Sequence, residues 1–107
     1  MKSFPSIVYI FWTCKDSEEA ETISCSLLDQ HLIACASILP SVRSIYRWEG
    51  KIEQGTETKV ILKTQSKHFT AICDYIQKHG SYQVPEISEV KIQEANPEYA
   101  AWLGEET

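Results

Sequence analysis

Apolar residues recur along the chain with two different periods, and these periods predict strands and helices in turn. Residues 6–13, SIVYIFWT, are rich in Val, Ile and aromatic residues without alternation. Such a run is typical of a central strand covered on both faces. From residue 16 the pattern becomes helical. The apolar stripe of this predicted helix consists of Ala20, Ile23, Leu27 and Leu28.

The start of this helix carries its own signal. Asp16 followed by Glu19 predicts a capping box, and further carboxylates follow in the first turn, where the helix dipole favours them. Cys25 falls off the apolar stripe, so we expect its thiol near the surface.

The middle of the chain predicts two long strands. Residues 32–40, LIACASILP, form a strand that is halted or kinked at Pro40. Residues 41–48 resume it, and residues 51–64 return in the opposite direction as the second arm of a hairpin.

Two X-Gly pairs compete for the turn of this hairpin. Glu49-Gly50 is the preferred turn because it leaves Ile52 and Val60 within a strand. Gly55 is then expected to form a β-bulge. A turn at Gln54-Gly55 remains an alternative.

A second helix follows the hairpin. Ser66 is its expected cap and Gly80 its expected end. Its apolar stripe consists of Phe69, Ile72, Cys73 and Ile76. This places Cys73 in the predicted core.

The last segment predicts a strand and a short helix. Residues 81–92 give a loop and then a fourth strand, and residues 96–106 give the helix. Asn96 is the expected cap, with Pro97 at the first helical position. The side chains expected to face inward are Tyr99, Trp102 and Leu103.

The order of elements is β-α-β, β-α-β and a terminal helix. Two such units with both helices on one face make an α+β, ferredoxin-like split βαβ sandwich, here expected as one domain over residues 1–107. Strands usually run about 5 or 6 residues, and both arms of the predicted hairpin are far longer. Tyr46 and Trp48, near its tip, would lack cover in a monomer, and long unpaired edges invite pairing with another chain. We therefore expect an oligomer with Tyr46 and Trp48 at its interface; the alternative is that these two side chains stack on a ligand.

Charge and cysteine spacing remove several classes of function. The net charge of −5 disfavours binding to nucleic-acid phosphates, which depends on clustered Lys and Arg. The apolar run of residues 7–12 is too short to span a bilayer, and MKSFPS lacks the pattern of a signal peptide. We expect a cytoplasmic protein whose four cysteines, which include no CxxC pair, stay reduced and hold no structural zinc.

Four segments in a fixed order carry a family resemblance. They are LIACASILPSVRSIYRWEGKIE (32–53), ILKT (61–64), YQVPEI (82–87) and NPEYAAWL (96–103). Together they resemble the CutA family, the divalent-cation tolerance proteins. The resemblance implies a homotrimer whose long hairpins extend sheets across subunit boundaries. It also implies a cytoplasmic protein linked to copper and other divalent metals, without an established enzymatic activity.

The metal ligands implied by the resemblance map only in part onto this chain. Trp12 stands where some members have a cysteine, and Cys14 follows two positions later. Gly80-Ser81-Tyr82 stands where the family commonly has His-Pro-Tyr, and His79 matches a histidine of some members. Thiolate and imidazole suit Cu and Zn. The candidate ligands of a weak divalent-cation site, Cu(II) first, are therefore His79, Cys14 and Cys35.

The resemblance also implies a cleft between subunits, bordered by Lys63, Tyr82 and Glu86. The alternative is purely structural: Cys35 packs against its neighbours, the Lys63 stem lies along the sheet, and Tyr82 and Glu86 hydrogen-bond within their loop. His31 and His68 lie on helix flanks, where we expect them to be solvated.

Three other classes of function lack their characteristic signals in this sequence. The sequence has no Cys-His spacing for a catalytic pair, no glycine-rich phosphate loop and no aromatic-basic consensus of an RNA-binding sheet. The remaining alternative is a trimeric signalling protein similar to the PII proteins, which bind nucleotide in the cleft between subunits. A scaffold that binds nothing is the third possibility.

Overall fold

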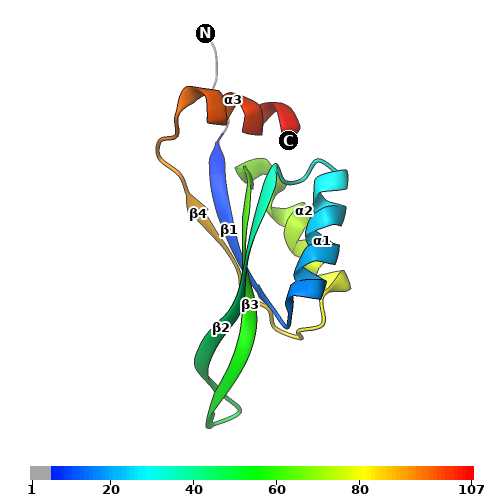
Figure 1. The fold of residues 1–107 in the computed structure, drawn as a ribbon, viewed down its shortest axis with the longest axis vertical. Coiled ribbons are helices and arrows are strands. Elements are labelled where there is room, and N and C mark those ends of the chain that lie inside the picture. The colour runs from blue at the N-terminus through cyan, green and yellow to red at the C-terminus, as the bar shows by residue number, and fades with distance from the viewer. Residues whose placement is uncertain (1–5) are drawn as a thin grey trace.

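A four-stranded antiparallel sheet carries two helices on one face (Figure 1) in the computed structural model, which describes residues 6–107. The elements are β1 (Ile7–Cys14), α1 (Ser17–Asp29), β2 (Cys35–Trp48), β3 (Lys51–Gln65), a 3-10 turn (Ser66–His68), α2 (Phe69–His79), β4 (Ile87–Lys91) and α3 (Pro97–Glu106). The strand order β2-β3-β1-β4 confirms the predicted ferredoxin-like sandwich. Among the helices of the described residues, none has the length and apolar character needed to cross a membrane.

The main core lies between the sheet and helices α1 and α2. Even-numbered residues of β1 and β3 point toward the helices, and the cross-strand pairs Ile10↔Leu62 and Trp12↔Val60 are buried. The helices contribute Ala20, Ile23, Leu27, Ile72 and Ile76. α3 covers the opposite face near the start of β1. The buried residues of this smaller cluster are Ile7, Ala34, Ala100 and Leu103.

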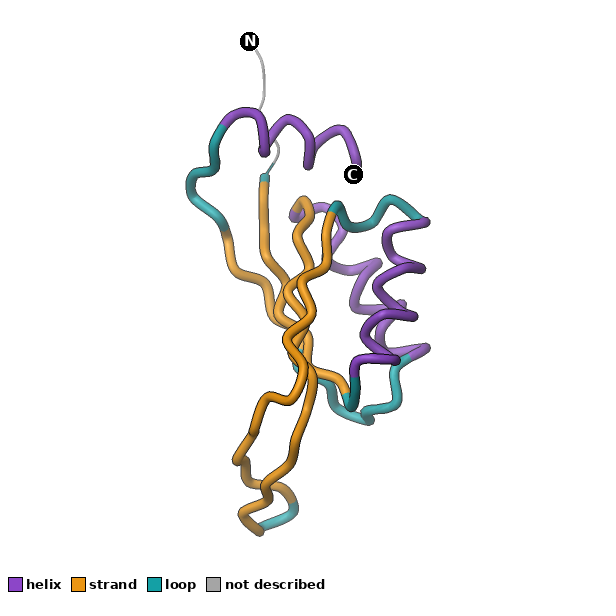
Figure 2. Tube along the Cα trace, in the orientation of Figure 1, coloured by secondary structure: helices purple, strands orange, loops and turns teal. Residues whose placement is uncertain are grey.

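β2 and β3 form the predicted long hairpin, with 14 and 15 residues. Figure 2 shows that its far end extends well beyond the helices. The turn lies at Glu49-Gly50, as predicted, and both residues have positive φ, 49° and 79°, as a type I′ turn requires. The hairpin makes the molecule elongated, with principal extents of 53 × 26 × 22 Å.

The β-bulge lies in β2, so the prediction of a bulge at Gly55 was wrong. Leu39 pairs with Lys59 and Val42 with Glu57, which leaves one extra residue in β2 between these pairs. Gly55 pairs in regular register with β2. The Gln54-Gly55 alternative for the turn is thereby excluded.

This bulge changes the face of the sheet to which β2 side chains point. Pro40 has no backbone N–H to donate and Ser41 has φ of 59°, so the ladder is interrupted between them. Before the bulge, Ile38 shares the helix-facing side of the sheet; after it, Tyr46 and Trp48 point to the opposite face. The pairing with β3 that resumes after the bulge therefore places the two aromatic side chains on the face opposite the helices.

Three side chains predicted to face the core are more exposed than expected. Leu28 is 39% exposed, Trp102 is 41% exposed, and Cys73 is partly exposed. On α1 it is Ser24, and not Leu28, that is buried beside Leu27. Ser24 lies at the centre of the helix face that packs against the sheet. Cys25 is exposed, as predicted.

The helix starts agree only in part with the capping predictions. Asp16 Oδ1 accepts a hydrogen bond from the Glu19 backbone N–H at 2.9 Å, as predicted. In a capping box the Glu19 carboxylate would accept in return from the Asp16 backbone N–H. Here it accepts from the backbone N–H of the preceding residue, Lys15, at 3.4 Å. Ser66 does not cap α2, because a 3-10 turn intervenes, and Asn96 makes no side-chain capping bond.

His31 and His68 both hydrogen-bond the end of α3. His31 is exposed, as predicted, whereas His68 is partly buried, so the prediction that His68 is solvated was wrong. His31 Nδ1 donates to the Glu106 carbonyl at 3.1 Å, and His68 Nε2 donates to the Thr107 carbonyl at 2.8 Å. Gln65 Nε2 donates to Thr107 Oγ1 at 2.9 Å. These bonds join the last helix to the segments that precede β2 and α2.

We predict that Gly80→Ala destabilises the protein. A Cβ at this position would lie 2.8 Å from the Ile76 carbonyl oxygen, so the end of α2 would have to shift. A cost of about 1–3 kcal/mol in the free energy of unfolding is expected from urea denaturation. Gly55→Ala is the control, because its Cβ would meet only Tyr46 Oη, at 4.0 Å. Equal stability of the two variants would contradict the prediction.

Candidate functional site

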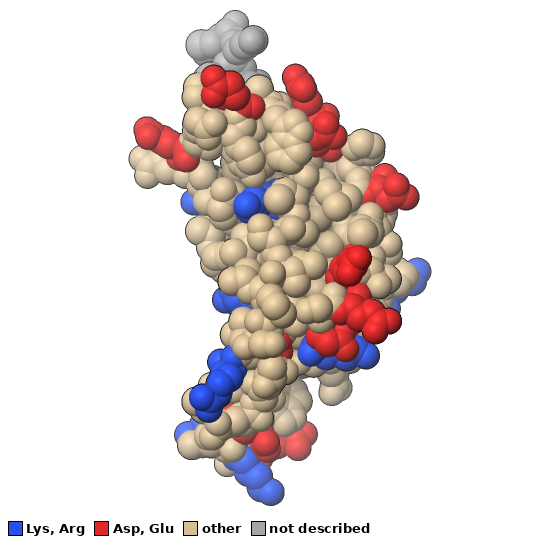
Figure 3. Space-filling model, in the orientation of Figure 1, with Lys and Arg blue, Asp and Glu red and all other residues tan. Residues whose placement is uncertain are grey.

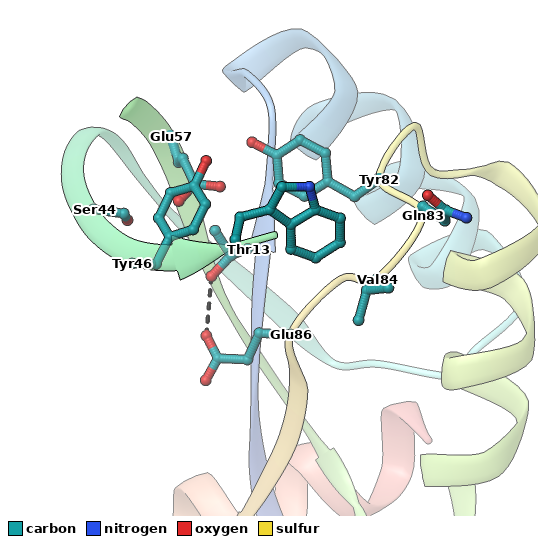
Figure 4. A pocket seen from close by; sticks show the side chains of 9 residues that line it. Thr13, Ser44, Tyr46, Glu57, Tyr82, Gln83, Val84 and Glu86 are labelled. Atoms are coloured by element: carbon teal, nitrogen blue, oxygen red, sulfur yellow. Dashed lines mark hydrogen bonds between the residues drawn. The ribbon is translucent and has the colours of Figure 1, made fainter. Parts of the chain in front are cut away.

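A pocket of about 510 Å³ lies between the hairpin and the loop that leads into β4 (Figure 4). Three parts of the chain supply its walls: the end of β1, the outer half of the hairpin and the loop after α2. The lining residues are Thr13, Ser44, Tyr46, Trp48, Glu57, Tyr82, Gln83, Val84 and Glu86. It lies on the side to which the β2 bulge turns Tyr46 and Trp48.

The carboxylate of Glu86 is held in a fixed orientation. Thr13 Oγ1 donates to Glu86 Oε1 at 3.0 Å, and Ser88 Oγ donates to Oε2 at 3.1 Å (Figure 4 shows the first bond). The Thr13 backbone N–H also donates to the Glu86 carbonyl at 3.3 Å. Both carboxylate oxygens thus have hydroxyl partners, and the side chain contributes a positioned negative charge to the pocket wall.

Tyr82 presents a neutral phenol to the pocket. Burial, together with the nearby Glu57 carboxylate, raises the pKa of Tyr82 well above its usual range. A phenol in this state acts as a hydrogen-bond donor and an aromatic surface, and does not ionise at neutral pH.

Glu19, on the first turn of α1, positions the loop that carries Tyr82. Its carboxylate accepts hydrogen bonds from the Ser81 backbone N–H at 2.5 Å and from Ser81 Oγ at 3.0 Å. The Gly80 N–H donates to the Ile76 carbonyl at 2.8 Å and ends α2 just before this contact. One carboxylate therefore connects the beginning of one helix with the loop that follows the other.

Two of the three residues predicted to border the cleft between subunits lie in this pocket of the single chain. Tyr82 and Glu86 line the pocket with Tyr46 and Trp48. Lys63 lies elsewhere: it pairs with Cys35, and its Nζ lies over the Tyr9 ring at 5.6 Å.

Sequence reasoning missed two lining residues with functional side chains. They are Thr13 and Glu57. The sequence signal for them was weak: Thr13 lies at the end of one predicted strand and Glu57 in the middle of the long return strand. The pairing of Cys14 with Thr58 brings these two positions together.

The candidate metal ligands do not converge. Cys14 pairs with Thr58 and Cys35 with Lys63. Five residues along β3 separate these partners, so the two thiols point to opposite faces and lie roughly 17 Å apart along the strand direction. His79 ends α2, is exposed, and stacks on Tyr75 with ring centroids 4.2 Å apart.

No closed metal centre is formed by the described residues. Within residues 6–107, no group of three or more His, Cys, Asp or Glu side chains is arranged to hold a metal ion. On the face shown in Figure 3, Lys and Arg are scattered among carboxylates and do not form a continuous basic surface.

We predict that the Cys14 thiol resists alkylation while the protein is folded. Burial, followed by the nearby Glu19 carboxylate, raises the pKa of Cys14 to about 11. At pH 8 about one Cys14 side chain in a thousand is then a thiolate, and the labelling rate should rise as the pH is raised toward 11. Mass spectrometry after brief iodoacetamide treatment should find label on exposed Cys25 and none on Cys14. Rapid native labelling of Cys14 in a Cys25→Ser variant would contradict this prediction.

The fold and the pocket define a class of protein: a ferredoxin-like sandwich with an overlong β2–β3 hairpin and a recess beside it. The model of the CutA1 divalent ion tolerance protein family matches residues 8–106. The chain belongs to this family. It is a divalent-cation tolerance family and not a known enzyme family.

Individual relatives agree with this assignment. The divalent-cation tolerance protein CutA of Salmonella newport is 37% identical over 101 residues, which cover 94% of this chain and 88% of the relative. The crystal structure of CutA1 from Oryza sativa has a TM-score of 0.95 at 27% identity, covering 99% of this chain and 97% of that one. A structure described as a periplasmic divalent cation tolerance protein CutA, from Archaeoglobus fulgidus, has a TM-score of 0.91 at 37% identity, covering 94% and 97%.

Proposed function

We propose that this protein is a non-enzymatic divalent-cation tolerance protein that acts in the cytoplasm as a homotrimer and binds divalent metal ions weakly. The observation that best supports a homotrimer is the outer end of the hairpin, which no other part of the described chain covers. At its outer end Ile45 is 65% exposed and Ile52 is 68% exposed, on the face opposite Tyr46 and Trp48. Four free cysteines suit a reducing compartment.

The open edge of the sheet gives a second reason for self-association. β2 is an edge strand of 14 residues, and one side of its backbone pairs with no strand among residues 6–107. Long edges of this kind pair readily with another chain unless they are covered. The homotrimer is the assembly that the resemblance to CutA proteins implies, and it would place Tyr46 and Trp48 at the rim of a contact made by Ile45 and Ile52.

The metal-binding part of the proposal centres on His79. Its imidazole is exposed at the end of α2, whereas Cys14 is buried and mostly protonated. A single accessible imidazole supports weak binding only, since tight sites combine several ligands in a fixed geometry. The names of relatives such as the Salmonella protein connect the family with divalent-cation tolerance.

A PII-like role with a nucleotide in the cleft is a weaker candidate. The pocket is in a suitable place, beside the hairpin. Its wall, however, includes Glu57 and Glu86, and the described residues that line it include no Lys, Arg or His, so the charged side chains of the wall would repel a phosphate group.

We predict that light scattering at micromolar concentration gives three times the 12.2 kDa mass of the chain. Ile52→Asp and Trp48→Ala should each loosen the assembly, by about tenfold or more in concentration for Ile52→Asp, because a charge replaces an apolar contact. The unfolding midpoint should rise with protein concentration. Gln77→Asp, an equal charge change on exposed α2, is the control. A monomeric wild type would contradict the proposal.

We predict weak Cu(II) binding that depends on His79. Imidazole must lose its proton to coordinate, so affinity should fall on acidification. His79→Ala should reduce the affinity measured by calorimetry by about tenfold, while the neighbouring Lys78→Ala should not change it. The assay must also follow the copper oxidation state, since an accessible thiol reduces Cu(II). If His79→Ala binds as well as wild type, the metal role does not lie at this residue.

A further inference from the structure

We propose that the pocket beside the hairpin binds a small organic cation, of the alkylated ammonium class, in a cage of aromatic rings. This goes beyond divalent-cation tolerance, and it concerns residues other than the proposed copper ligand His79. Three observations support it: the aromatic walls, the sign of the charge around them, and the size of the space.

The aromatic walls come from two separate parts of the chain. Tyr46 and Trp48 lie two residues apart on β2 and therefore point to the same side of the hairpin. Tyr82 lies across the pocket, on the loop after α2 (Figure 4). The faces of aromatic rings are electron-rich and attract cations that approach within about 6 Å of the ring centre. Three such rings around one space form a surface suited to a cation.

The charged side chains among the described residues that line the pocket have a single sign. Glu57 and Glu86 are the ionisable carboxylates of the wall, and the lining includes no basic side chain to neutralise them. Glu86 is fixed by Thr13 and Ser88, so its charge stays at the pocket rim whether or not a ligand is present. An anion is disfavoured here, and a cation gains from both carboxylates.

The same features favour an organic cation over a bare metal ion. A divalent ion needs several oxygen or nitrogen ligands in exchange for its tightly held water, and both Glu86 oxygens already accept hydroxyl bonds. Alkylated ammonium groups hold water weakly and need no directional ligands. A space of about 510 Å³ falls within the usual range for small organic ligands, roughly 300–1,000 Å³, and far exceeds a single ion.

All of the lining belongs to one chain, and the pocket lies on one face of the hairpin only. Side chains alternate along the hairpin, so Ile45 and Ile52 lie on the opposite face from Tyr46 and Trp48. A second copy seated on the isoleucine face contacts the hairpin without filling the pocket. Gly55, on the pocket face, adds no side chain that would narrow it.

The test compares choline with its uncharged isostere 3,3-dimethylbutan-1-ol, both titrated into the intact wild-type assembly by calorimetry. Choline should bind saturably, with a dissociation constant of about 1 mM or tighter, and at least about tenfold better than the isostere. Intrinsic fluorescence should change on binding, because Trp48 is the tryptophan of the pocket. Choline binding should be unchanged in His79→Ala, which separates this proposal from the copper site.

Variants assign the binding to the pocket. Glu57→Gln, nearly equal in size, and Trp48→Leu should each weaken choline binding by about tenfold or more, and Glu57→Gln should leave isostere binding unchanged. Trp102→Phe, a conservative change on exposed α3, is the control and should bind choline as wild type does. Each variant is checked for the wild-type assembly state, and Glu57→Gln stands as the test if Trp48→Leu dissociates.

Four results would overturn the proposal. Equal binding of choline and the isostere would show an apolar recess without charge recognition. Absence of saturation up to about 100 mM choline would exclude a binding site of this class. Full affinity in Glu57→Gln would place the ligand elsewhere. Stoichiometric displacement of choline by Zn(II), or tighter binding of ATP than of choline in the same pocket, would assign the pocket to a metal or a nucleotide.

Discussion

The double pairing of β3 is the constraint on which the rest of the structure depends. Its inner half pairs with β1 on one side and β2 on the other, so it fixes the buried face against which both helices pack. Its outer half pairs with β2 alone, beyond the helices. The same strand therefore supplies a covered core at one end and an uncovered ribbon at the other, and both the pocket and the proposed subunit contact arise where this cover ends.

The pocket depends on contacts that cross the fold and not on one local motif. Glu19 belongs to α1 yet holds the loop after α2, and Glu86 bonds to side chains of β1 and β4. Each carboxylate joins segments that are far apart in the sequence. These bonds explain how a loop outside the regular elements can present Tyr82 in a defined place. They also mean that the aromatic surface and the charge near it are set by the tertiary structure.

Much of the fold could be predicted because its signals are local. The stripe of α1, the X-Gly turn at Glu49-Gly50 and the proline at the start of α3 each depend on a few neighbouring residues. The bulge was predicted at the wrong position because the residue with positive φ, Ser41, is not a glycine and gives no sequence signal. Gly55 suggested a bulge, but it pairs in regular register. The Thr13–Glu86 bond spans 73 residues and the His31–Glu106 bond spans 75. No periodicity indicates such contacts, so the sequence predicted neither the bond that fixes Glu86 nor the bond of His31 to the end of α3.

The bulge at Pro40 and Ser41 has a consequence for changes in chain length. Deletion of one residue there would remove the bulge and leave the outer hairpin on its present faces, because β3 has no extra residue and paired residues share a face. One residue added to each arm beyond the bulge would instead exchange the two faces. Isoleucines would then occupy the recess, and Tyr46 and Trp48 would face the opposite side, although every backbone hydrogen bond of the ribbon could still form. Matched insertions preserve the two surfaces when they add an even number of residues to each arm. The parity of the residue count in this segment is thus part of the information that the sequence encodes.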